Sequence, residues 1–395
     1  MQVIERAGRS RTGRRIDGLG EVVQLVRAGG ARTVSELAGS TGLARSTVGL
    51  RVEHLLRRGV LQAGGDVPAQ RGRPPTVLRF NPRAGVVLVA QLGMTGARIG
   101  VVDLAGEVLL DASVAVAVEA GAATVIDWIA KEFDRLLRRQ KRPRSDLWGI
   151  GIGLPGAVDL TASGGSGWAP DPVADRLRAH FGPGVPTFID HDLRLLSLGE
   201  QRACWPDIDV LLCVKVGTVI GCGVVIGGQA VRGAQGLAGE IGHAVVTGRR
   251  TPCRCGNVGC LNAVAGGGAL AENLAAQGLP AAHASDVADL ARAGVPEAVR
   301  AVRAAGRDIG RVLATTVNLL NPSAVALWGY LVEAEEPLFA GIRETVYRHS
   351  LPAATRNLQL VRARMGDNAG VQGAAIMVLD EVLAPEAIDR FLQPA

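Results

Sequence analysis

Three cysteines and one histidine lie close together in the second half of the chain. The segment Cys253-Arg-Cys255-Gly-Asn-Val-Gly-Cys260 follows Gly239-Glu-Ile-Gly-His243. Three thiolates and one imidazole make a complete tetrahedral ligand set for Zn²⁺, and four protein ligands leave no open position for water. We therefore expect His243, Cys253, Cys255 and Cys260 to hold a structural zinc ion. A chance group of buried thiols is the alternative, which the close spacing disfavours.

The positive charge of the chain is concentrated near its N-terminal end. Residues 1–83 carry fifteen arginines, no lysine and six acidic residues, a net charge of +9, whereas the remainder has a net charge of −3. Such an asymmetry predicts a polyanionic partner for the N-terminal segment. A basic tail that only improves solubility is the alternative that charge alone leaves open.

The hydrophobic pattern of this segment predicts an α+β winged helix-turn-helix domain over residues 19–81, after a basic, Gly-rich tail at 1–18. The expected elements are helices over residues 19–28, around Leu37 and over 44–58, and strands over 60–62 and 76–80. Thr33 or Ser35 can cap the short middle helix. Three helices followed by two strands and their connecting loop are typical of proteins that bind double-stranded DNA.

DNA binding requires short polar and basic side chains at the major groove and cations at the phosphates. The second long helix supplies such side chains in its N-terminal half, and the wing supplies an Arg-Gly-Arg-Pro segment that can enter the minor groove. The expected DNA contacts are Arg45, Ser46, Thr47, Arg51, Arg71, Gly72 and Arg73. A helix-turn-helix used only for packing or dimerisation is the alternative.

The rest of the chain has the pattern of an α/β protein. Beyond Asn81-Pro82, three strand patterns precede a helix over about residues 122–139, and two more strand patterns follow. This order differs from the strict alternation of a doubly wound sheet. A second set of strand patterns begins near Val210, so we expect two similar α/β halves.

Several motifs in the same order give the chain a resemblance to a known family. They are the Gly-Arg-Pro of the wing, GLPGAVD at 153–159, the segment 191–200 ending in LGE, AGEIGH with the cysteine loop, and DNAGVQGAA near the C-terminus. From about residue 19 onward the chain resembles the ROK family of repressors and sugar kinases, and the winged helix is similar to its sugar-responsive repressor branch. The resemblance implies a two-lobed, actin-like (ribonuclease-H-like) fold, with a first lobe at 84–203 plus 368–395 and a second lobe, carrying the zinc loop, at 204–367.

The resemblance also implies a sugar site between the lobes. The residues expected there are Gly156 of the GLPGAVD loop and His191, Asp192, Arg194, Glu240, His243 and Asn262. Several of these positions differ from the family pattern. His191 and Arg194 stand where the pattern has Asn, and Asn262 stands where it has Glu. Val219 lies within a turn that is Gly-rich in the pattern. Arg194 would suit an anionic group. The ligand therefore differs from a plain hexose, or the pocket no longer binds one; the sequence leaves both open.

The nucleotide site of the family's kinases is altered in this chain. Their DxGxT loop holds the phosphates of Mg-ATP, whereas this chain has Gln91-Leu-Gly-Met94-Thr95. Gln cannot position Mg²⁺ through a negative charge. Near the adenosine end of the expected nucleotide site, the bulky side chains of Trp328 and Tyr330 would crowd a bound nucleotide. We therefore expect no ATP binding and no enzymatic activity, although Asp192 matches the kinases' catalytic base.

The sequence thus predicts a ligand-responsive transcriptional regulator, expected to be a repressor. Its expected partners are an operator in double-stranded DNA, a sugar or sugar derivative, and further copies of itself in a homodimer or homotetramer. No apolar run of signal-peptide or membrane-spanning length is present, so we expect a cytoplasmic protein without a membrane partner. An active ATP-dependent carbohydrate kinase with an accessory DNA-binding domain is one alternative, and a DNA-binding regulator that responds to no ligand is another.

Overall fold

A computed structural model describes residues 18–66, 76–93, 96–116, 120–155, 168–366 and 368–392. The chain begins with helices α1 (Leu19–Arg27), α2 (Val34–Thr41) and α3 (Arg45–Arg57), and continues with strands β1 (Leu61–Asp66) and β2 (Thr76–Phe80). The two strands pair antiparallel. The order of three helices and two strands predicted for this segment is confirmed, and the first strand extends further than expected. No helix among the described residues has the length and apolar character needed to cross a membrane.

Local sequence explains where the turn of the helix-turn-helix lies. The Thr33 hydroxyl accepts a hydrogen bond from the backbone N–H of Glu36 at 3.2 Å, and the Glu36 carboxylate accepts from the backbone N–H of Thr33 at 3.0 Å. This reciprocal capping box begins α2 at Val34. Gly42 ends it with φ of 68°, a backbone conformation that glycine adopts without strain. Of the two candidate caps, Thr33 is the one used.

A mixed five-stranded sheet follows, in the order β5-β4-β3-β6-β7. Its strands are β3 (Val86–Leu92), β4 (Gly96–Asp103), β5 (Val108–Ala115), β6 (Leu147–Leu154) and β7 (Thr187–His191). Helices α4 (Ala122–Arg139) and α5 (Pro170–Phe181) pack on one face, and α13 (Asn368–Val382) packs on the other. Strands β3, β4 and β5 are antiparallel neighbours, whereas β6 and β7 run parallel to β3.

The second sheet repeats this pattern in the order β10-β9-β8-β11-β12. Its strands are β8 (Val210–Val216), β9 (Ile220–Ile226), β10 (Gln229–Ala230), β11 (Ala324–Trp328) and β12 (Gln359–Arg362). Its helices are α7 (Leu261–Ala265), α8 (Gly267–Ala275), α9 (Ala284–Arg292), α10 (Pro296–Leu320), α11 (Glu336–His349) and α12 (Pro352–Thr355). Strand β8 pairs antiparallel with β9 and parallel with β11, as β3 does with β4 and β6. The two similar α/β halves expected from the sequence are therefore present.

Two helices join the sheets across the middle of the molecule. Helix α6 (Asp192–Cys204) packs tightly on α13. A Cβ at Gly373 would lie 1.7 Å from the Leu195 carbonyl oxygen, and a Cβ at Gly199 would lie 2.0 Å from the Ala369 carbonyl oxygen. Only glycine permits this approach of the two backbones. Movement of α6 must therefore carry α13 with it.

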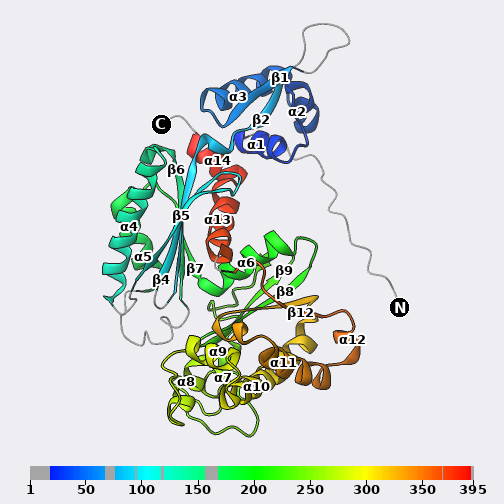
Figure 1. Cartoon of the computed structure of the whole chain (residues 1–395). Coiled ribbons are helices and arrows are strands. Elements are labelled where there is room, and N and C mark those ends of the chain that lie inside the picture. Colours follow the sequence, from blue (N-terminus) through cyan, green and yellow to red (C-terminus); the bar gives the residue numbers. More distant parts are fainter. Residues whose placement is uncertain are drawn as a thin grey trace.

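The last helix, α14 (Pro385–Leu392), contacts the N-terminal helices directly. Figure 1 shows α14 (red) between α1 (blue) and the first sheet, α13 running alongside that sheet towards α6, and the second sheet at the far end of the molecule. The hydrophobic core of α1–α3 continues into the core formed by β3 and α13. The N-terminal unit is thus packed on the first sheet, mainly through α14. The residue limits assigned to the tail and lobes from the sequence stay a prediction.

Candidate functional site

The four predicted metal ligands converge in the structure. The ligand atoms of His243, Cys253, Cys255 and Cys260 all lie within 4.8 Å of one another. The Cys253 sulfur is 3.8 Å from Nδ1 of His243, and the Cys255 and Cys260 sulfurs are 3.6 Å apart. A tetrahedral zinc ion with Zn–S bonds of about 2.3 Å separates its sulfur ligands by about 3.8 Å. The donor set and its spacing therefore fit a zinc ion.

The loop that carries the thiols is shaped by backbone bonds and glycines. Cys253 donates its backbone N–H to the Asn257 carbonyl at 2.8 Å, and Cys260 pairs with Val245 in an isolated β-bridge. Gly259 has φ of 78°, and a Cβ there would lie 2.7 Å from the Arg249 carbonyl oxygen. These contacts shape the segment that carries the three thiols.

The thiols differ in their pKa values. A hydrogen bond from the backbone of Asn257 lowers the pKa of Cys255 to about 7, with smaller contributions from the neighbouring thiols and His243. Burial, with a smaller contribution from the adjacent thiols, raises the pKa of Cys260 to about 12. A bound cation stabilises thiolates and releases their protons. The cluster therefore supplies the ligand chemistry of a closed, structural metal site.

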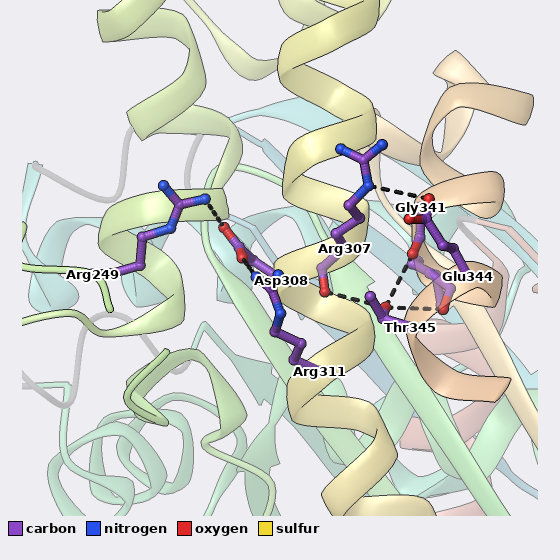
Figure 2. A network of polar contacts seen from close by, with 8 residues as sticks. Arg249, Arg307, Asp308, Arg311, Gly341, Glu344 and Thr345 are labelled. Carbon is purple, nitrogen blue, oxygen red and sulfur yellow. Dashed lines mark hydrogen bonds and ion pairs between the residues drawn. The ribbon is translucent and has the colours of Figure 1, made fainter. Parts of the chain in front are cut away.

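A buried ion pair ties the cysteine loop to the longest helix of the second sheet. Figure 2 shows Arg249 of the loop reaching Asp308 of α10, at 2.6 Å, with Arg311 on the other carboxylate oxygen. The side chain of Asp308 is only 2 % exposed. Arg307, the residue before Asp308 on α10, binds Glu344 of α11 through its guanidinium at 3.1 Å. The position of the loop is thus fixed to the α10–α11 pair.

Asp192, the expected ligand residue at the start of α6, already has partners on both carboxylate oxygens. One oxygen accepts from the backbone N–H of Leu193 at 2.8 Å, and the other from the Lys215 ammonium at 2.9 Å. The same ammonium lies 5.1 Å from the centre of the Trp328 ring, a cation–π contact. Lys215 was not among the residues expected from the sequence, because it lies on β8, far from Asp192 along the chain.

Arg194 forms an internal ion pair. Its guanidinium binds the Asp190 carboxylate and donates to the Gly236 carbonyl oxygen at 2.5 Å. The side chains of Arg194 and Asp190 are both buried, 8 % and 5 % exposed. The expectation that Arg194 also meets an anionic ligand stays a prediction. Arg232 binds the second oxygen of Asp190 at 3.0 Å and remains 64 % exposed.

Glu240 lies close enough to the expected ligand residues His243, His191, Asp192 and Arg194 to interact with their charges. Burial raises the pKa of Glu240, an effect that the charges of His243 and His191 oppose. The Asn262 side-chain oxygen accepts the backbone N–H of Ile220 at 2.6 Å, so it holds the turn before β9. Gly156 lies outside the described residues.

A small pocket of about 50 Å³ opens beside these residues. The residues that line it are Leu154, Pro155, Trp168, Pro170, Ile189, Asp190, His191 and Arg194. Its lining combines apolar side chains with the polar groups of Asp190, His191 and Arg194, and its volume is below about 300 Å³, the size at which typical small-molecule pockets begin.

Gln91 stands on β3, at the position of the kinases' phosphate-loop carboxylate. Its side-chain oxygen is buried, without a hydrogen-bond partner among the described residues. A Cβ at Gly153 would lie 2.6 Å from this oxygen, and a Cβ at Gly370 would lie 2.4 Å from the amide carbon. The Gln91 side chain therefore fills the space between β6 and the start of α13. Met94 and Thr95 lie outside the described residues.

Helix α3 presents part of the expected DNA-binding set. Arg45 and Ser46 are exposed, and Thr47 and Arg51 are half-buried. The Arg51 guanidinium reaches the Gly18 carbonyl at 3.5 Å. The structure adds one exposed residue that the sequence pattern did not single out, Leu50. The expected wing contacts, Arg71, Gly72 and Arg73, lie outside the described residues.

The Asp190 network yields a prediction for stability. Arg194→Met is expected to lower the free energy of unfolding by about 2 kcal/mol, because it leaves a buried carboxylate with one exposed cation as its remaining side-chain partner. Arg232→Met, which removes the exposed partner, should cost less than about 1 kcal/mol. Urea denaturation of both variants measures the difference. Equal losses would contradict the role assigned to Arg194.

Comparison with known proteins agrees with this architecture. The family model "ROK family" matches residues 87–381. The xylose repressor of Bacillus spizizenii is 26% identical over 354 residues, which cover 88% of this chain and 91% of that protein. A crystal structure of a ROK family transcriptional regulator, a homolog of the Escherichia coli MLC protein, superposes with a TM-score of 0.74 at 24% identity, covering 95% of this chain and 98% of that one.

Kinases of the family match a shorter part of the chain. A ROK hexokinase from Thermus thermophilus superposes with a TM-score of 0.61 at 31% identity, covering 74% of this chain and 97% of the hexokinase. The predicted fold class, a two-lobed α/β kinase fold preceded by a helical N-terminal unit, is confirmed by these likenesses. By its sequence motifs, its duplicated sheets and these matches, the chain belongs to the ROK family.

Proposed function

We propose that this protein is a ligand-responsive, DNA-binding transcriptional regulator of the repressor type, without phosphoryl-transfer activity. The observation that carries the proposal is the N-terminal unit of α1–α3, β1 and β2, which is packed on the kinase-like part through α14. Repressors match the chain over about nine tenths of its length, whereas the kinase match covers three quarters. The basic N-terminal segment complements the phosphates of DNA.

The effector is proposed to be a sugar or sugar derivative. One relative that covers 88% of the chain is named for xylose, and the cleft gathers fixed polar side chains of the kind that pair with hydroxyl groups. Glu240, His191 and His243 supply acceptors and donors there. Because Arg194 is neutralised by Asp190, a neutral ligand fits the cleft better than the anionic one first suggested by the sequence.

Two contacts argue against kinase activity. The Lys215 ammonium occupies one oxygen of Asp192, the residue that would take the proton of a sugar hydroxyl. The Gln91 side chain fills the space beside Gly153 and Gly370 where a phosphate would approach the backbone. We propose that these substitutions leave the cleft able to hold a ligand but unable to transfer a phosphoryl group.

The structure offers a path from the cleft to the DNA-binding unit. Asp192 begins α6, α6 is packed on α13 through Gly199 and Gly373, and α13 leads into α14. A ligand that favours one arrangement of the two sheets would shift α14 and the helices it contacts. In a homodimer or homotetramer, such a shift would change the spacing of two recognition helices on an operator.

Zinc is proposed as a structural cofactor of this regulator. His243, Cys253, Cys255 and Cys260 would hold it, and the ion would cross-link the loop and leave no ligand position for substrate. His243 would be fixed by the metal while its ring borders the cleft. A regulator of this kind would work in the cytoplasm, on chromosomal DNA.

One pair of experiments tests the proposal. The full-length protein should shift a fragment of its own upstream region at moderate salt in the presence of excess random DNA. Calorimetry with Mg²⁺ and ATP at about 1 mM should give no binding heat. This concentration is at the upper end of the usual range of KM values for enzyme substrates. Equal affinity of the protein for its own upstream fragment and for random DNA would contradict the proposed regulator function. Clear binding of ATP would instead support the alternative of an active kinase.

A further inference from the structure

Helix α3 leaves one large apolar side chain in water. Leu50 is 69 % exposed, whereas Val48, Val52 and Leu55 on the other side of the helix are buried in the core of the N-terminal unit. An isolated exposed leucine is ordinary on a protein surface. A functional role for Leu50 is instead indicated by its position on this helix and by the side chains around it.

Leu50 belongs to a row of exposed side chains along α3. The row consists of Ser46, Leu50, Glu53 and Arg57. At 3.6 residues per turn these positions fall on the side of the helix opposite Val48. The row begins in the first turn of α3, and it is the N-terminal part of a recognition helix that meets base edges in this class of domain. Leu50 therefore stands in the half of the helix that faces the bases.

The surface around Leu50 fits DNA better than an apolar partner. Gly49 has no atom within 4 Å of the place where a Cβ would stand, so the surface beside Leu50 is open. Arg45 and Arg57 are exposed at the two ends of the same helix. Apolar docking sites on proteins are contiguous patches, whereas Leu50 is a single apolar group among polar and basic ones. Basic side chains around it complement phosphates.

The major groove presents a single apolar group, the 5-methyl group of thymine. Serine, glutamate and arginine can each pair with polar base edges, whereas leucine can only make an apolar contact there. We propose that Leu50 determines operator specificity by packing on the 5-methyl group of a thymine, an inference that rests on the proposed DNA-binding function. The preferred operator then contains a T·A pair at one fixed place in each half-site.

Deoxyuridine provides a direct test, because it pairs like thymidine and lacks only the methyl group. An operator is first selected from random duplexes with the full-length protein, and each thymidine of one half-site is then replaced singly. At one position the replacement should weaken binding roughly fourfold, the effect of exposing one buried methyl group. Leu50→Ala should weaken binding to the thymidine operator by at least the same factor. It should also abolish the difference between the thymidine and deoxyuridine operators.

Leu319→Ala is the matched control, since Leu319 is 78 % exposed on α10, in the second half of the molecule. It should leave both the affinity and the deoxyuridine effect unchanged. A deoxyuridine effect of equal size in the native protein and in Leu50→Ala, or no effect at any thymidine, overturns the inference while specific DNA binding stands. Failure of the native protein to select any sequence overturns the regulator proposal and this inference together.

Discussion

Cys260→Ser is expected to carry no stoichiometric zinc and to lose more than about 3 kcal/mol of unfolding free energy. Cys260 is fully buried and directly precedes α7, and its sulfur lies 3.6 Å from the Cys255 sulfur. Metal binding that occurs only in the folded state adds directly to its stability. Loss of one ligand therefore removes both the cross-link of the loop and the order of the segment between His243 and α7. Elemental analysis and thermal unfolding measure the two effects.

The matched control is Cys204→Ser, at a half-buried thiol outside the cluster. It should retain one zinc per chain and unfold within about 1 kcal/mol of the native protein. A chelator should reproduce the effect of Cys260→Ser in the native protein and in Cys204→Ser. Native protein isolated without zinc, or equal stability of the two variants, would show that the four side chains serve another purpose.

The effect of the metal should extend beyond the loop. Arg249 lies four residues after Val245, which forms the β-bridge with Cys260. Its guanidinium binds the buried carboxylate of Asp308 on α10. If the loop loses its order, this carboxylate keeps only Arg311 as an ion-pair partner on its own helix. Removing one partner of a buried charge is costly. A metal bound by the cysteine–histidine cluster would thus contribute to the packing of α10, although the cluster lies on a loop.

The metal cluster could be predicted from the sequence because its determinants are local. The cysteines are near neighbours in the chain, and the glycines between them set the loop. The ion pairs of the cleft could not be predicted in the same way. Lys215 meets Asp192, and Arg194 meets Gly236, through the pairing of strands and helices that lie far apart in sequence. An arginine at position 194 suggested an anionic partner. In the structure that partner is the carboxylate of Asp190, which lies at the same junction of β7 and α6.

The same distinction applies to the fold. The capping box at Thr33 and the order of helices and strands follow from local pattern, and the two-lobed fold followed from motifs in a fixed order. Nothing in the sequence showed that α14 would contact α1. The amphipathic pattern of a helix predicts that one of its faces is buried, but it does not predict which element covers that face. This contact joins the N-terminal unit to the rest of the described structure, so we expect it to matter for the proposed response to a ligand.

Gly20→Ala is expected to loosen this contact. Gly20 is buried in α1, and a Cβ there would lie 2.1 Å from the Pro385 carbonyl oxygen at the start of α14. Backbone cannot yield to such an overlap without moving the helix. Helix α14 is also held by a hydrogen bond from the Gly20 N–H to Asp389 at 2.9 Å and, at its C-terminal end, by one between His54 and the Leu392 carbonyl at 3.1 Å. Crowding of this kind costs about 2 kcal/mol.

Gly39→Ala makes the same chemical change in α2, where no atom lies within 4 Å of the new Cβ. It should stabilise the protein by up to about 1 kcal/mol, because alanine favours a helix over glycine. The two variants should therefore differ by about 3 kcal/mol. Hydrogen exchange should accelerate in α1 and α14 of Gly20→Ala alone, since only that substitution separates the two helices. Unchanged exchange there would mean that the N-terminal unit is held in place by contacts other than α14, and the proposed path from the cleft to the recognition helix would have to run elsewhere.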